Sequence, residues 1–149
     1  MQPRRISTHE PVSQLRHVPI AECGEPLVDY LRACPQLLVA EPVWEYKRVH
    51  DALHYSKDNY HSVASLYPDK PVVISEAGWA TNSNGRGICP ENTSQDLQAI
   101  YYEDLMEWTA SEGILTFVFE AFDEPWKGSP DPMEPEKHWG LFTVDREPK

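Results

Sequence analysis

The first residues that could carry out chemistry follow a short apolar run near the middle of the chain. Residues 72–74 (Val-Val-Ile) are followed, after Ser75, by a carboxylate, Glu76, and then by Gly78 and Trp79. Because β-branched residues favour strands, Glu76 is predicted to lie where a strand ends. A carboxylate in that place could act as an acid, a base or a nucleophile. The indole ring of Trp79 could offer a flat face to a sugar.

A second polar and aromatic cluster follows the apolar run at residues 114–119. It contains Glu120, Phe122, Glu124, Trp126 and Lys127. The alternative interpretation is that both clusters are solvated, with Glu76 facing water and Glu124 paired with Lys127. Phe122 and Trp126 argue against it, because rings of this size need an apolar surface or a ligand to cover them.

Carboxylates beside aromatic rings are typical of carbohydrate sites. An indole stacks on the apolar face of a pyranose, and carboxylates bind hydroxyl groups or take part in the reaction. A retaining glycosidase needs two carboxyl groups about 5–5.5 Å apart, one of which is the nucleophile. The two clusters therefore favour a glycoside-binding or glycoside-cleaving site.

The elements that must position these clusters follow a repeating order. Hydrophobic spacing predicts a strand at residues 37–40, a helix at 51–67, a strand at 71–75, a helix from 93 to 112 and a strand at 114–121. A further short helix is predicted at residues 25–33. The alternation indicates a parallel sheet of α/β class, in which functional residues collect at the carboxyl ends of the strands. An eight-stranded barrel needs about 250 residues, so the sheet is either a small open one or part of a larger barrel.

Composition restricts the classes of partner. The chain has 149 residues, 24 of them acidic and 13 basic, and a formal net charge of −11. This excess of acid argues against nucleic acid and against an anionic membrane surface. No apolar run is long enough to span a membrane, and none near the start forms a signal core. Three cysteines without Cys-x-x-Cys spacing indicate no zinc site, and the spacing of His50 and His54 is better explained by a solvated helix face than by a metal. We expect no metal and no cofactor.

The sequence resembles the family-seventeen glycoside hydrolases, the β-1,3-glucanases. Ser75-Glu76-Ala77-Gly78-Trp79 is similar to the family's Glu-Thr/Val-Gly-Trp signature. Residues 119–127 and 137–142 resemble its closing block. The resemblance covers residues 43–149 and leaves residues 1–42 as a poorly aligned, irregular segment. It implies a partial TIM barrel made of about the last three βα units.

The resemblance also implies roles for individual residues. Glu76 matches the nucleophile at the end of strand seven, and Glu124 and Lys127 match a Glu and a Lys that flank it. Trp44 matches a short segment after strand six. Glucan-groove positions are implied for the remaining members of the two clusters: Trp79, Glu120, Phe122 and Trp126.

One departure from the family pattern bears on activity. The family's acid/base Glu lies in an Asn-Glu pair after strand four, and this chain contains no Asn-Glu pair. We therefore expect a truncated, retaining endo-β-1,3-glucanase-like chain that keeps the nucleophile and hydrolyses glucan poorly by itself. The alternatives are a non-catalytic carbohydrate-binding or interaction fragment, and a fragment without independent function. The resemblance implies β-glucan as the partner, with the missing barrel half as a possible second one, and an extracellular or cell-envelope location.

Overall fold

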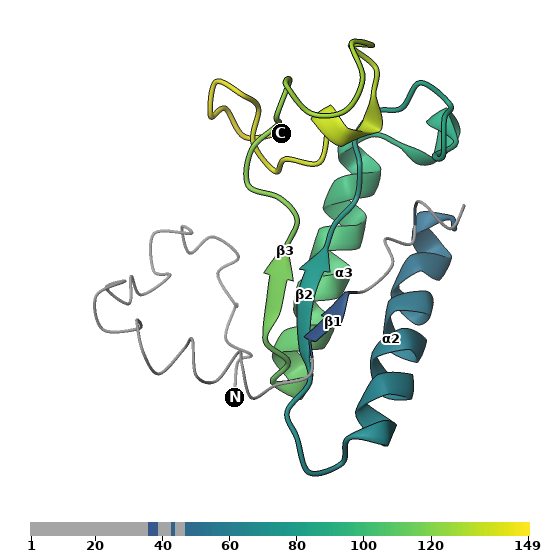
Figure 1. Cartoon of the computed structure of the whole chain (residues 1–149), viewed down its shortest axis with the longest axis vertical. Coiled ribbons are helices and arrows are strands. Elements are labelled where there is room, and N and C mark those ends of the chain that lie inside the picture. Colours follow the sequence, from purple (N-terminus) through teal and green to yellow (C-terminus); the bar gives the residue numbers. More distant parts are fainter. Residues whose placement is uncertain (1–35, 39–42, 44–46) are drawn as a thin grey trace, which may run out of the picture. The chain divides into compact units, whose positions relative to one another are not determined.

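The computed structural model describes residues 36–38, 43 and 47–149, which belong to one compact unit at residues 34–149. Its sheet has three parallel strands in the order β1 (Gln36–Leu38), β2 (Val73–Ala77) and β3 (Thr116–Val118) (Figure 1). The predicted parallel βαβ order is therefore confirmed. The helix predicted at residues 25–33 lies outside the described residues, as does the irregular segment predicted at residues 1–42 except for residues 36–38. The division between residues 42 and 43 stays a prediction.

Two long helices connect the strands and pack together. Helix α2 is Val49–Leu66 and helix α3 is Gln95–Glu112. The start of α3 is fixed by Ser94, whose Oγ accepts a hydrogen bond from the Leu97 amide at 3.0 Å, which is the expected action of an N-cap serine. Its end is fixed by Gly113, which takes a left-handed backbone conformation at φ 68° as predicted. Two single-turn 3₁₀ helices, η2 (Pro90–Asn92) and η3 (Pro135–Lys137), lie in the loops.

The helix faces that are buried differ from the predicted ones. For α2 we predicted an inner face of Leu53, Tyr60, Val63, Ala64 and Tyr67, whereas the buried residues are Val49, Ala52 and Ser56. Only Leu53 and Tyr60 of the predicted set pack partly against the core. The prediction was wrong because it followed large apolar side chains, while the close approach of α2 to α3 requires small ones. At this contact the hydroxyl groups of Ser56 and Tyr101 are 3.0 Å apart.

The predicted face of α3 needs one correction. Tyr101, Leu105 and Trp108 are buried as predicted, but Ile100 is exposed and Gln98 is buried in its place. The core between the helices and the sheet contains Ile74, Trp79, Tyr101, Leu105 and Trp139. The amide of Gln98 is therefore enclosed by apolar side chains and needs polar partners.

The chain leaves β3 earlier than predicted and pairs with a distant segment. After Val118, residues 120–123 run beside residues 139–142 and exchange main-chain hydrogen bonds with them. The Leu141 amide donates to the Glu120 oxygen at 3.0 Å, and the Asp123 amide donates to the Phe142 oxygen at 2.9 Å. The peptide between Phe119 and Glu120 is cis. The strand predicted at residues 114–121 is thus shorter, because its last residues have a different partner.

One face of β3 is left open to solvent. Leu115 and Phe117 alternate along the chain and are 37% and 41% exposed. Apolar side chains on consecutive odd positions lie on the same face of a strand.

In the part of the chain that the structure describes, neither long helix has the length and apolar character needed to cross a membrane.

Candidate functional site

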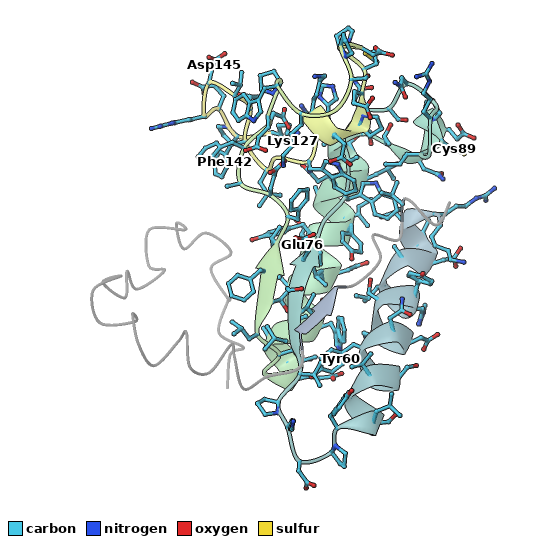
Figure 2. All side chains as sticks on the ribbon, in the orientation of Figure 1. Tyr60, Glu76, Cys89, Lys127, Phe142 and Asp145 are labelled. Atoms are coloured by element: carbon cyan, nitrogen blue, oxygen red, sulfur yellow. The ribbon has the colours of Figure 1, made fainter. Side chains whose placement is uncertain are left out.

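Glu76 lies at the carboxyl end of the central strand, as predicted. Strand β2 ends at Ala77, whose main-chain oxygen accepts a hydrogen bond at 2.8 Å from the amide of Phe119, the residue that follows β3. The Glu76 side chain is exposed, while its neighbours Ala77 and Gly78 are buried. Figure 2 shows Glu76 at the end of β2 nearest the loops that carry Lys127 and Phe142. The parallel strands thus bring the two clusters to the same end of the sheet.

The second cluster is built around one ammonium group. Lys127 Nζ is 2.7 Å from Glu120 Oε2 and 2.5 Å from Glu124 Oε2. It also lies 4.6 Å from the centre of the Phe119 ring. The pairing of Glu124 with Lys127 that the solvated alternative predicted is present. The cluster differs from a surface ion pair because the Glu120 side chain is only 15% exposed and joins the same ammonium.

Burial and charge act against each other in this cluster. Burial raises the pKa of Glu120, although the neighbouring Lys127 ammonium opposes the shift. Burial by itself would lower the pKa of Lys127, but the two carboxylates outweigh it and the pKa is raised. The second carboxyl oxygen of Glu120 is buried and has no hydrogen-bond partner among the described residues. A buried carboxyl oxygen without a hydrogen bond lowers the stability of the fold.

Two exposed aromatic residues belong to the same segment of the chain as the cluster. Trp126 is 71% exposed and Phe122 is 42% exposed. The Phe122 ring packs against Phe142 with 5.8 Å between ring centres, and the Arg146 guanidinium lies over it at 5.9 Å. These rings can cover the apolar face of a ligand because solvent reaches them now.

Trp79 does not have the exposure that a groove-lining ring needs. It is 1% exposed, and its indole N–H donates to the Asn92 oxygen at 2.9 Å. Its ring lies 5.2 Å from that of Tyr101. The expectation that Trp79 lines the groove is wrong, because this large ring fills the core beneath the end of β2. Trp44 lies outside the described residues.

Three polar residues that shape the site were not among those predicted from the sequence. Gln98 Nε2 donates to the oxygens of Trp79 at 2.8 Å, Trp139 at 3.0 Å and Gly140 at 3.2 Å. Asp123 accepts from the Lys149 ammonium at 2.8 Å. Lys137 donates to main-chain oxygens of the loop that contains Lys127. Only Gln98 had a usable signal, since it lies three residues before Tyr101 on the same helical face.

Among the described residues, no group of three or more His, Cys, Asp or Glu side chains is arranged to hold a metal ion. The chemistry that this end of the sheet can perform is that of carboxylates next to an ammonium and aromatic rings. Parallel βα units with such a site at the carboxyl ends of their strands define a class, the carbohydrate-active β/α enzymes.

Known proteins place the chain within that class. Residues 27–140 match the family model of the BtgE/BtgC glycoside hydrolase domain. A glucan 1,3-β-glucosidase of Arthroderma benhamiae is 32% identical over 124 residues, which cover 76% of this chain and 40% of the relative. This chain belongs to the BtgE/BtgC glycoside hydrolase family.

Solved structures agree with the family assignment. The β-1,3-glucanosyltransferase of Rhizomucor miehei, a glycoside hydrolase family 17 enzyme solved as an active-site mutant with laminaritriose, is 28% identical with a TM-score of 0.66. The match covers 76% of this chain and 40% of that one. An endo-laminarinase from Formosa is 39% identical with a TM-score of 0.58, over 67% of this chain and 28% of that one. The resemblance to family seventeen is therefore confirmed, and the chain spans well under half the length of these relatives.

Proposed function

We propose that this chain carries the nucleophile side of a retaining site for β-1,3-glucan, with Glu76 as the nucleophile. The observation that carries the proposal is the position of Glu76 at the carboxyl end of β2, exposed and beside the end of β3. On this proposal β1, β2 and β3 are the last three strands of a TIM barrel. One relative is named as a glucan 1,3-β-glucosidase, and another was solved in complex with laminaritriose. Both support β-1,3-glucan as the class of substrate.

The remaining residues of the cluster bind and orient the sugar. The Lys127 ammonium neutralises part of the charge of Glu120 and Glu124 and fixes both carboxylates in place. Glu124, whose side chain is 28% exposed, then accepts hydrogen bonds from glucose hydroxyl groups, while the more buried Glu120 holds the Lys127 ammonium in place. Phe122 and Trp126 stack on the apolar faces of the glucan.

The proton donor is the part of the reaction that this chain does not supply. A β-1,3-linked glucose is a poor leaving group and must be protonated as it departs, and the Asn-Glu pair that carries the family's acid is absent from the sequence. A substrate with an acidic phenol as leaving group removes this requirement. In that case the Glu76 carboxylate attacks the anomeric carbon, the bond to the phenol oxygen breaks, and dinitrophenolate leaves with the electron pair.

The experiment that tests Glu76 as the nucleophile therefore uses a substrate whose leaving group needs no protonation. The 149-residue chain is incubated with 2,4-dinitrophenyl 2-deoxy-2-fluoro-β-laminaribioside, in which the fluorine slows release of the covalent sugar. Intact-mass spectrometry should show one added laminaribiosyl group on the wild type and none on Glu76→Gln. Glu103→Gln, which changes an exposed glutamate on α3, is the matched control and should label like the wild type. Labelling of Glu76→Gln, or no labelling of the wild type, would refute the assignment of Glu76 as the nucleophile.

A second function, glucan binding without turnover, is favoured by the exposure of Trp126 and Phe122. It predicts saturable binding of laminaripentaose by calorimetry without any labelling by the fluorinated substrate. Release of reducing ends from laminarin that is lost in Glu76→Gln would instead support catalysis by this chain.

A further inference from the structure

A buried lysine lies beneath the loop that carries Lys127. Lys137, at the end of η3, is only 8% exposed. Its Nζ donates to the main-chain oxygens of Pro125 at 2.7 Å and Lys127 at 2.6 Å. A buried ammonium is costly unless it is hydrogen-bonded. Here the two carbonyl groups satisfy it, so the side chain is held firmly against this loop.

Lys137 is connected to the two carboxylates through Lys127. Lys137 holds the backbone of Lys127, and the Lys127 side chain extends to the carboxylates of Glu120 and Glu124. The main-chain amide of Lys127 also donates a hydrogen bond to the main-chain oxygen of Glu124 at 2.9 Å, which closes a tight turn. The far end of the loop is tied to the same segment as Lys137, since Ser129 Oγ donates to Glu134 Oε2 at 2.6 Å.

We propose that Lys137 is a positioning residue that fixes the Lys127 ammonium between Glu120 and Glu124 and thereby sets the affinity of this chain for β-1,3-glucan. Lys137 itself has no contact with the carboxylates; it acts through the backbone of the 125–127 turn. The affinity part of this inference rests on the proposed function. The placement of the Lys127 ammonium does not, and it can be measured without any sugar.

The first experiment observes the Lys127 ammonium directly by ¹H–¹⁵N NMR of the lysine NH₃⁺ groups. Hydrogen bonds to two carboxylates slow the exchange of these protons with water, and the signal is assigned by its loss in Lys127→Met. In Lys137→Met the signal should shift and broaden. Lys149→Met is the matched control, because Lys149 is also a buried lysine but binds Asp123 and Thr81 instead of the turn. An unchanged Lys127 signal in Lys137→Met would overturn the proposal.

The second experiment is a double-mutant cycle with laminaripentaose, measured by calorimetry. Lys137→Met should weaken binding by roughly tenfold in the wild-type background and by almost nothing further in Lys127→Met, because coupled residues are non-additive. Equal losses in both backgrounds would assign Lys137 a general structural role and refute positioning through Lys127. If the wild type binds no laminaripentaose, the proposed function fails, while the NMR result still decides the positioning.

A milder variant protects the test from loss of folding. Lys137→Gln keeps a side-chain N–H donor for one of the two carbonyl groups but removes the charge. It should give smaller changes in the same direction in both experiments. A folded Lys137→Gln with the wild-type Lys127 signal and wild-type affinity would count against the proposal.

Discussion

A Cβ atom placed on Gly78 would lie 1.8 Å from the main-chain oxygen of Phe119, so the backbones that follow β2 and β3 leave no room for a side chain at this position. This close approach of the two backbones aligns the loop after Glu76 with the loop that leads to Glu120. It also explains why a glycine follows the predicted nucleophile by two residues, since any side chain would push the two loops apart.

Replacing this glycine should destabilise the chain. We expect Gly78→Ala to lower the free energy of unfolding by about 3 kcal/mol or more, because the backbone oxygen of Phe119 cannot move aside without breaking the pairing of β2 and β3. The comparison variant is Gly113→Ala, where no atom lies within 4 Å of the added Cβ and only the left-handed backbone is strained. It should cost about 1 kcal/mol. Urea unfolding measures both values, and equal losses would contradict the steric argument.

The buried side-chain amide of Gln98 should contribute strongly to the free energy of unfolding. Gln98→Leu leaves the oxygens of Trp79, Trp139 and Gly140 without this donor, and we expect a loss of about 2–4 kcal/mol in the free energy of unfolding. Gln95→Leu, at an exposed position at the start of α3, is the control and should change it by less than about 0.5 kcal/mol. A neutral Gln98→Leu variant would show that the three carbonyl groups find other partners.

Charge in the Lys127 cluster should make stability depend on pH. Burial raises the pKa of Glu120 in the folded chain above its ordinary value of 4.5. The folded state therefore holds this proton more tightly, and the resulting stabilisation is full below 4.5 and is lost as the pH rises through the raised pKa. The variant Glu120→Gln has no such proton. The free energy of unfolding of the wild type relative to the variant should thus fall between pH 4.5 and the raised pKa. Urea unfolding across this range measures it, and a constant difference would contradict the shift.

The two tryptophans of the sequence clusters should respond in opposite ways. Trp126→Ala removes an exposed ring and should weaken laminaripentaose binding roughly fivefold, about 1 kcal/mol, with no change in thermal midpoint. Trp79→Ala removes a buried ring and should cost about 3–5 kcal/mol of stability. Tyr67→Ala, an exposed ring at the other end of β2, is the control and should leave affinity unchanged. Calorimetry and thermal unfolding separate these outcomes.

Local patterns explain which features were predictable from the sequence. The β-branched run before Glu76 and the glycine at residue 113 act on their own neighbourhoods, so the position of Glu76 near the end of a strand and the end of α3 were predicted correctly, although β2 ends two residues later than the predicted strand. The burial of Trp79 depends on Tyr101 of α3, and the donor role of Gln98 depends on residues 139 and 140, about forty positions away. No nearby residue signals such contacts. The same holds for Lys137, whose acceptors are main-chain oxygens that any residue could supply.

The parallel order of the sheet also has a kinetic consequence. The pairing of Ile74 with Thr116 can form only after residues 75–115, including all of α3, have been brought back along the sheet. The entropy of closing so long a loop is lost before any of the contacts that it creates are gained, which slows folding. During this wait the edges of β2 and the apolar face of β3 are uncovered. We therefore expect that a longer delay before β2 pairs with β3 lowers the amount of soluble protein that can be recovered, because the exposed edges and apolar face favour aggregation.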